Sequence, residues 1–368
     1  MERNLKESIV LLLSFIVYIF IFKITKLYTV ELRANLVIMF SFLTAFFIFL
    51  DYRKIKIIKD LYFIKYIVIE NIVLFLACFV FSFFMSNYLG YTFFYHFNDL
   101  VLFSPLIILF SVFLSFLGYR EKSDLFLFSN KWFYIRKFIL KILFIPYIYG
   151  VTFETLNKIL VIDSFYFRDI DYYFFLFGLL VDVAIGLFGY VFSSHLLKNE
   201  IKSVDGSVKG WLICMICYNP LLYFYEVFFS QVDNYTWKDW AVGEWYYYPW
   251  LALIVISWLI YSFSTYAFGF KFSNLTWRGL INTGTYHYVK HPAYLSKNIY
   301  WWLYTVPLFG IYGWDILNNV IALLVFNLIY YARAKTEEQH LMQFAEYREY
   351  NEWMKQNGLW AKFKKIWH

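Results

Sequence analysis

The sequence predicts an all-α polytopic membrane protein with about ten transmembrane helices and with its N-terminus and C-terminus in the cytoplasm. Its residues are 61% hydrophobic and 16% charged, whereas soluble domains average about 45–50% apolar and about 25% charged residues. The apolar residues gather in runs of about 20, the length of a helix that crosses a bilayer. Lys and Arg are concentrated in alternate loops between these runs. These three observations predict the fold class.

We expect a transmembrane helix wherever the sequence stays nearly continuously apolar for roughly 17–25 residues. The expected helices cover residues 8–25, 35–50, 64–85, 100–119, 138–158, 172–194, 209–229, 249–270, 298–312 and 315–332. The last two are joined at Gly310–Trp314, which predicts a tight helical hairpin. The 45 Phe and 35 Tyr residues fit lipid contact and interface positions rather than a cofactor site.

The distribution of positive charge gives the predicted orientation. With both termini inside, the inner segments hold 27 of the 33 Lys and Arg residues. Cytoplasmic loops of membrane proteins carry such an excess. The net charge of +7 is therefore interpreted as topology and contact with anionic lipid, and no nucleic-acid partner is expected.

The division into domains is predicted from a change in loop character. Residues 1–195 form an accessory transmembrane helical region, and 196–368 form a domain whose cytoplasmic loops are richer in polar and aromatic residues. No Gly/Ser-rich or Pro-rich linker separates the two. Cys214 and Cys217 form a C-x-x-C in an apolar run, without a second pair of ligands at metal spacing. They are interpreted as small apolar helix residues, and no metal is expected.

Two polar blocks interrupt the apolar pattern in the C-terminal half. The first runs from Gly284 to Tyr294 and the second from Arg333 to Glu338. Ionisable groups beside membrane spans are energetically costly and indicate a functional site. An ordinary juxtamembrane charge cluster would explain either block alone. Their occurrence in this order, with an expected helical hairpin between them, favours a single site.

The two blocks resemble the isoprenylcysteine carboxyl methyltransferase family, a group of integral-membrane enzymes related to phospholipid N-methyltransferases. The family's blocks read G-P-Y-x-x-x-R-H-P-x-Y and R-x-x-x-E-E-x-x-L. The matching positions are Gly284, Tyr286, His291, Pro292 and Tyr294 in the first block, and Arg333, Glu337, Glu338 and Leu341 in the second. Thr285 replaces a Pro, and Lys290 replaces an Arg. Lys290 keeps the charge but lacks the planar fork that binds a carboxylate through two hydrogen bonds. The resemblance covers about residues 250–352.

The resemblance implies a methyltransferase that uses S-adenosylmethionine and acts on a lipid or lipidated, prenylcysteine-like acceptor at the cytoplasmic membrane face. Asn274-Leu-Thr276-x-Arg278-Gly279 and Ser296-Lys297-Asn298 also resemble a bacterial subgroup of this family, so a bacterial inner membrane is the expected location. The implied catalytic residues are Arg333 and Glu338. The implied cofactor-binding residues are Tyr286, Lys290, His291, Pro292, Tyr294, Glu337 and Glu338. The implied substrate-binding residues are Asn298, Arg333 and Tyr347.

Several alternatives stay open from the sequence. The acceptor atom is a carboxylate oxygen, an amine or another nucleophile. Tyr218-Asn219-Pro220 marks either an acceptor site or a packing kink. The architecture also resembles NADPH-dependent sterol reductases, although their tail motif differs. A transporter or lipid-binding protein would instead use the carboxylates within spans, namely Glu70, Asp182 and Glu226.

Overall fold

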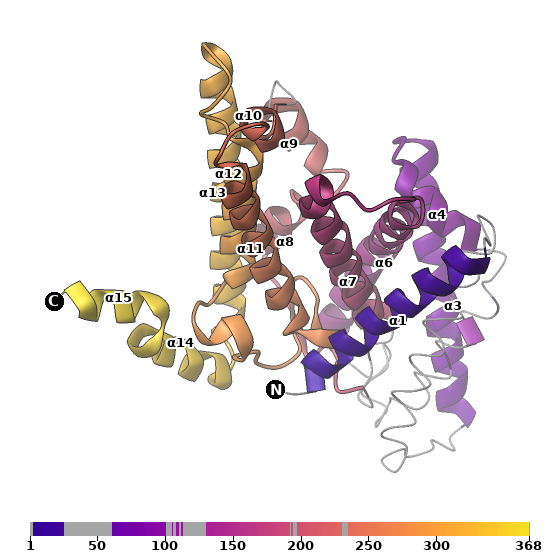
Figure 1. Cartoon of the computed structure of the whole chain (residues 1–368). Coiled ribbons are helices and arrows are strands. Elements are labelled where there is room, and N and C mark those ends of the chain that lie inside the picture. The colour runs from indigo at the N-terminus through magenta and orange to yellow at the C-terminus, as the bar shows by residue number, and fades with distance from the viewer. Residues whose placement is uncertain are drawn as a thin grey trace. The chain divides into compact units, whose positions relative to one another are not determined.

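The structure is a computed structural model of the chain, drawn in Figure 1. It describes residues 3–25, 61–100, 130–191, 197–229 and 235–367, together with residues 105, 108, 109, 112 and 193. Helices dominate the described residues, and a two-stranded antiparallel sheet pairs Ser203 with Trp277. The predicted all-α fold class is therefore confirmed.

The chain forms two compact units, each assembled from separate stretches of sequence. The first contains residues 1–164, 179–204 and 268–279, and the second contains 165–178, 205–267 and 280–368. Within the described residues, the α-helices and strands of the first unit are α1 (Arg3–Thr25), α3 (Leu61–Asn87), α4 (Tyr95–Asn98), α6 (Lys131–Leu160), β1 (Ser203–Val204) and β2 (Thr276–Trp277). Helix α7 (Ile170–Val191) contributes residues to both units. The predicted division at residue 195 stays a prediction.

The second unit carries both polar blocks. Its helices are α8 (Val208–Met215), α9 (Leu222–Phe229), α10 (Trp237–Ala241), α11 (Tyr247–Tyr266), α12 (Pro292–Thr305), α13 (Trp314–Leu341), α14 (Ala345–Asn357) and α15 (Leu359–Trp367). The 3-10 helix η7 (Gly284–His287) lies between α11 and α12.

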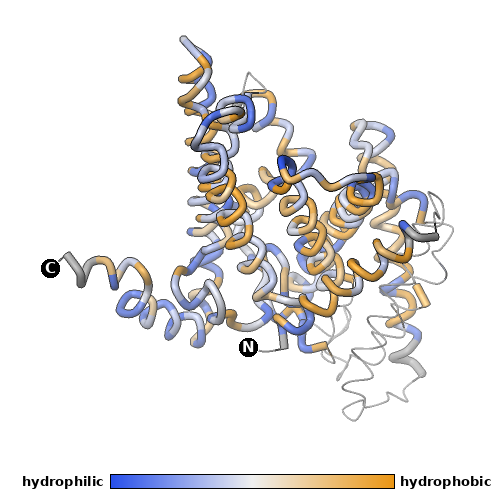
Figure 2. The backbone as a smooth tube through the Cα atoms, viewed as in Figure 1, coloured by the Kyte–Doolittle hydropathy of each residue, from blue (hydrophilic) through white to orange (hydrophobic). Residues whose placement is uncertain are grey.

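Six helices within the described residues are long and apolar enough to cross a bilayer. They are α1, α3, α6, α7 with the turn before it, α11 and α13. Figure 2 shows the hydrophobic colouring along these helices. On α3, Leu76 and Val80 expose 55% and 65% of their surface, as expected of side chains that face lipid tails. The protein is therefore an integral membrane protein.

The count of ten spans is not reproduced. The expected spans 35–50 and 100–119 lie wholly or mostly outside the described residues. The prediction of one continuous helix over 209–229 is wrong, because α8 ends at Met215 and α9 begins at Leu222. Pro220 lies between them, and its ring and missing N–H disfavour a continuous helix. The orientation of the termini stays a prediction.

The expected span 298–312 also has different bounds. Helix α12 begins at Pro292 and ends at Thr305. Its 14 residues reach about 21 Å, less than the roughly 30 Å hydrocarbon core of a bilayer. Val306 then adopts a left-handed conformation with φ 38°, and Gly310 and Gly313 have φ values of 76° and 67°. These three residues form the predicted turn before α13.

Helix α12 is held against α11, which fixes the start of α12 beside the polar blocks. The two helices pack along each other. At one end of this contact, the Trp250 indole donates to the Leu303 carbonyl at 2.8 Å. Near the other end, Ser264 and Thr285 share a hydrogen bond of 2.9 Å. These bonds hold the last turn of α12 and the 3-10 helix η7 against α11.

In the first unit, Arg278 fastens the strand β2 to the end of α7. Its guanidinium is buried and donates to the Gly189 carbonyl at 3.0 Å, to the Asn199 carbonyl, and to Ser273 Oγ at 2.7 Å. Burial lowers the pKa of Arg278 to about 10, so the side chain is still charged at neutral pH. Bonds from a charged donor to buried carbonyls contribute more than neutral ones.

We expect Arg278→Met to destabilise the protein by about 2–4 kcal/mol, because it removes the charge-assisted hydrogen bonds to two buried carbonyls, those of Gly189 and Asn199. The measurement is thermal unfolding of the purified protein in detergent. Arg168→Gln is the matched control, since the Arg168 side chain is 77% exposed. Equal shifts of Tm for the two variants would contradict the prediction.

Candidate active site

The first polar block forms a short loop that ends at the N-terminus of α12. Gly284 starts η7 with a φ of 61°, a conformation that costs glycine little because it lacks a Cβ atom. His291 is the N-cap residue of α12, and Pro292 occupies the first turn, where the missing proline N–H has no helical partner to lose. The sequence thus fixes where α12 begins and directs Lys290 and His291 to its amino end.

The second polar block lies on the last turns of α13. Arg333, Glu337 and Glu338 all precede the end of the helix at Leu341. The Arg333 Nε atom is 3.6 Å from Glu337 Oε1, one helical turn away. Helix α13 therefore presents one cation and two carboxylates toward the start of α12.

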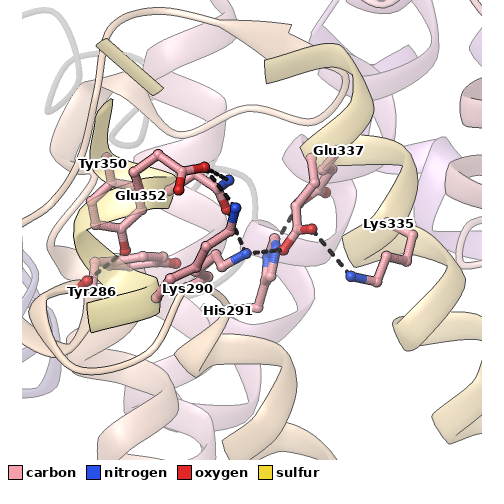
Figure 3. Close-up of polar contacts among 10 residues, drawn as sticks. Tyr286, Lys290, His291, Lys335, Glu337, Tyr350 and Glu352 are labelled. Carbon is pink, nitrogen blue, oxygen red and sulfur yellow. Dashed lines mark hydrogen bonds and ion pairs between the residues drawn. The ribbon is translucent and has the colours of Figure 1, made fainter. Parts of the chain in front are cut away.

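Glu338 is the centre of the resulting cluster. Its Oε1 atom accepts from Lys290 Nζ at 3.2 Å and lies 3.2 Å from His291 Nε2. Its Oε2 atom accepts from Lys335 Nζ at 3.2 Å. Figure 3 shows Lys290 and His291 approaching from the loop while Lys335 comes from the same helix as Glu337. The Glu338 side chain is 18% exposed, so water screens these contacts only in part.

Glu337 binds the other side of the His291 ring. Its Oε1 atom accepts a hydrogen bond from the Tyr294 hydroxyl, and its Oε2 atom is 3.9 Å from His291 Nδ1. The rings of His291 and Tyr294 are parallel, with centroids 5.6 Å apart. Both ring nitrogens of His291 thus face carboxylates, and this arrangement fixes the orientation of the ring.

Arg333 is buried between two tyrosine rings. Its side chain is only 6% exposed, and the guanidinium carbon lies 5.6 Å from the Tyr218 ring centroid and 5.4 Å from that of Tyr294. Its Nη2 atom also donates to the Tyr218 hydroxyl at 3.4 Å. Aromatic faces stabilise a cation that is largely removed from water. Glu337 adds a carboxylate to the same guanidinium.

Helix α14 supports the loop from the far side. The Tyr350 hydroxyl donates to the Tyr286 carbonyl at 2.6 Å, and Asn351 Oδ1 accepts from Lys290 Nζ at 2.8 Å. Tyr347 packs near Tyr350, with ring centroids 5.8 Å apart. Burial raises the pKa of both Tyr347 and Tyr350 well above the ordinary value, so both hydroxyls stay protonated. Lys290 is therefore held between Glu338 and Asn351.

The structure brings most of the predicted site residues into one network. Lys290, His291, Tyr294, Arg333, Glu337 and Glu338 are in direct contact. Pro292 is buried and starts α12, and Tyr286 takes part through its carbonyl rather than its ring. Tyr347 lies on α14 beside Tyr350.

Asn298 does not join the network. It lies one turn after Tyr294 on α12, and its Oδ1 atom is buried without a hydrogen-bond partner among the described residues. Such an oxygen is costly to leave unpaired. Its place on the same helix face as Tyr294 leaves an acceptor atom available for a ligand.

Sequence reasoning missed Asn351 and Lys335 as members of the cluster and left Tyr218 undecided. The signals were present. Asn351 directly follows Tyr350, Lys335 stands inside the second block, and Tyr218 precedes Asn219-Pro220. What was missing was the folding of α14 back onto the loop and the placement of α8 beside α13.

The donor set of this cluster suits a zwitterionic ligand that also carries hydroxyl groups. Lys290, Lys335 and Arg333 supply positive charge, and Glu337 and Glu338 supply acceptors for ammonium or hydroxyl donors. The Glu337 and Glu338 side chains are 27% and 18% exposed. A ligand can therefore reach them and replace part of the internal ion pairing.

Comparison with known proteins identifies the domain that holds this cluster. Residues 250–343 match the model of the isoprenylcysteine carboxyl methyltransferase family. A search of curated proteins and a search of solved structures each found no match. The matched residues run from α11 through α13 and include both polar blocks. Within this integral membrane protein, residues 250–343 are thus similar to the isoprenylcysteine carboxyl methyltransferase family, a family of membrane methyltransferases.

Proposed function

We propose that the protein transfers a methyl group from S-adenosylmethionine to a lipid or lipidated acceptor at the cytoplasmic face of the membrane. The observation that carries this proposal is the contact of Glu338 with both Lys290 and His291. That contact joins the two polar blocks of the family domain into one site. The site lies at the end of α13, a helix long enough to cross a bilayer.

The residues of the cluster fit S-adenosylmethionine by the chemistry of their side chains. Glu337 and Glu338 are suited to the amino group and ribose hydroxyls, and Lys290 is suited to the carboxylate. The ring of Tyr294 offers a face to a positively charged sulfonium. The cofactor supplies a methyl group that is already activated, so the chain must bind, orient and exclude water.

The acceptor side of the site is assigned to Arg333 and its neighbours. Arg333 is buried beside Tyr218 and Tyr294, where it can orient an anionic group of an acceptor. Asn298 offers a buried Oδ1 atom to a hydrogen-bond donor of the acceptor. Tyr347 lies on α14, which packs against the loop. A lipid would enter from the bilayer, since α13 is long and apolar enough to cross it.

We expect S-adenosylmethionine and S-adenosylhomocysteine to raise the Tm of the purified protein, while NADPH leaves it unchanged. A ligand at 100 times its Kd that binds only the native state adds about 2.7 kcal/mol of stability. The measurement is thermal unfolding monitored by tryptophan fluorescence. A shift with NADPH and none with S-adenosylmethionine would favour a reductase over the proposed methyltransferase.

We expect Glu338→Gln and His291→Ala each to weaken S-adenosylmethionine binding by roughly ten- to a hundredfold. The reason is the loss of a charge-assisted contact, which contributes on the order of 1.5–3 kcal/mol. Isothermal titration calorimetry measures the Kd, and a methyl-transfer assay measures the loss of activity. Glu349→Gln is the matched control, because Glu349 is an exposed carboxylate on α14.

A purely structural role for the cluster gives a different pattern. In that case Glu338→Gln would lower expression or Tm without changing the Kd of the protein that does fold. Equal binding by Glu338→Gln and Glu349→Gln would remove Glu338 from the proposed site.

We expect the loop before α12 to face the cytoplasm. Asn282→Cys should react with a membrane-impermeant maleimide only from the cytoplasmic side, and Glu244→Cys only from the opposite side. Both positions are exposed, so reactivity reports the side of the membrane rather than burial. Labelling of Asn282→Cys only from outside would place the cluster beyond the reach of cytosolic S-adenosylmethionine.

A further inference from the structure

We propose that α15 lies on the membrane surface as an interfacial helix that binds anionic lipid headgroups and, through this contact, positions the loop of the candidate site. The surface binding stands on its own observations. Only the last step, an effect on catalysis, rests on the proposed function.

The apolar side chains of α15 are exposed in the described residues. Leu359, Trp360 and Phe363 expose 38%, 71% and 49% of their surface. Positions 359, 360 and 363 lie within one helical turn, so these three side chains share one face of the helix. Trp and Phe on one face of a strongly amphipathic helix are typical of segments that lie in the membrane interface.

The positive charge of this segment indicates that the exposed face of α15 binds anionic lipid. After Glu352 the sequence contains no acidic residue, while Lys355, Lys362, Lys364 and Lys365 follow. Lys362 is exposed, two residues from Trp360. A cluster of Lys beside an apolar face is attracted to the anionic headgroups of a membrane surface. A protein partner with an apolar groove would not require this excess of positive charge.

The neighbouring helix shows that the exposure of α15 is specific to it. Helix α14 is also amphipathic, but its apolar face is buried and includes Tyr347, Tyr350 and Met354. The chain turns at Gly358, where an added Cβ would come within 2.6 Å of the Met354 carbonyl oxygen. In Figure 1, α13 runs from the top to the bottom of the view, whereas α14 and α15 run across the view from side to side. A helix lying across a membrane-spanning helix has the direction expected at the interface.

Besides the bonds of Tyr350 and Asn351, further contacts connect this part of the chain to the site loop, among them Lys362 Nζ, which lies 5.9 Å from the Tyr288 ring centroid. The Leu359 N–H, at the start of α15, donates to the Tyr288 carbonyl at 2.8 Å. The Trp353 ring of α14 lies 4.6 Å from the His287 ring, centroid to centroid. Tyr288 is two residues before Lys290. A surface that holds α15 therefore also restrains the loop that supplies Lys290 and His291 to Glu338.

The first test measures amide hydrogen exchange of the full-length protein by mass spectrometry. The protein is placed in nanodiscs of phosphatidylcholine alone or mixed with phosphatidylglycerol. Peptides covering 359–367 should exchange at least about tenfold more slowly with phosphatidylglycerol, since each Lys near an anionic surface adds roughly a fivefold gain in partitioning. Peptides of α11 serve as the internal reference and should not change.

Lys→Gln variants test whether the protection depends on the positive charge of α15. Lys362→Gln, Lys364→Gln and Lys365→Gln combined should abolish the lipid-dependent protection, whereas Lys355→Gln should keep it, because Lys355 lies on α14 and pairs with Glu352 at 2.6 Å. Equal exchange of α15 in both nanodiscs would overturn the proposal. Protection that follows the number of protein copies per disc, and not the lipid, would also overturn it in favour of a second copy of the chain.

A fluorescence experiment tests the position of the apolar face directly. The environment-sensitive NBD dye is attached at Phe363→Cys or at Ala361→Cys, with the three native cysteines replaced by serine and folding checked by Tm. Positions 361 and 363 lie on opposite faces of the helix. Brominated lipids should quench the dye at 363 at least severalfold more than at 361. Equal quenching at the two positions would contradict an interfacial helix with this orientation.

A separate assay of methyl transfer tests whether the contact of α15 with lipid affects catalysis. Methyl transfer should rise with the phosphatidylglycerol content for the wild type and not for the triple Lys variant, at equal affinity for S-adenosylmethionine in detergent. If no methyl transfer is detected with any acceptor, the proposed function fails while the exchange and quenching results still decide the membrane contact. If α15 binds the surface but activity is the same in both lipids, the coupling to the loop is refuted.

Discussion

The bond network around the Glu338 carboxylate is the interaction on which the rest of the site depends. One oxygen faces Lys290 and His291 from the loop, and the other faces Lys335 from the same helix. Without this carboxylate, Lys290 and Lys335 would approach each other with no anion between them. The loop is short and starts at a glycine turn, so an opposing charge on α13 is needed to hold Lys290 and His291 at the amino end of α12.

The second feature of the site is a separation of its charges by depth. Glu338, Lys290 and Lys335 are partly accessible, whereas Arg333 lies one turn deeper and is nearly buried. The buried guanidinium is stabilised by the tyrosine rings and by Glu337 rather than by water. In the proposed reaction, a polar ligand from the aqueous side would meet the accessible group, and an acceptor from the membrane side would meet the deeper cation. This arrangement allows two ligands of different polarity to approach one site.

Much of this could be predicted from the sequence, because the strongest signals are local. Apolar length identified the helices now seen as α1, α3, α6, α7, α11 and α13, and the spacing of Arg333, Glu337 and Glu338 placed them on one helix. The two errors of span arise where local signals conflict. Residues 209–229 are mostly apolar, yet Pro220 divides them. Residues 298–312 combine most of α12 with a turn, and hydropathy does not indicate the backbone conformation of a turn. The contacts of Asn351 and Tyr218 depend on segments distant in sequence, so no periodic pattern could reveal them.

Because the Tyr218 ring packs against Arg333, the segment 250–343 does not contain every residue that the site needs. The matched segment ends at residue 343 and begins at 250, but Tyr218, Tyr350 and Asn351 lie outside it and supply an aromatic face, a hydrogen bond to the loop and a partner for Lys290. The matched segment alone therefore does not form the complete site. A lineage that moved only this segment into another membrane protein would carry a buried arginine with one ring missing and a loop lysine with one acceptor missing. The site therefore needs an aromatic ring and an amide from the segments that flank residues 250–343.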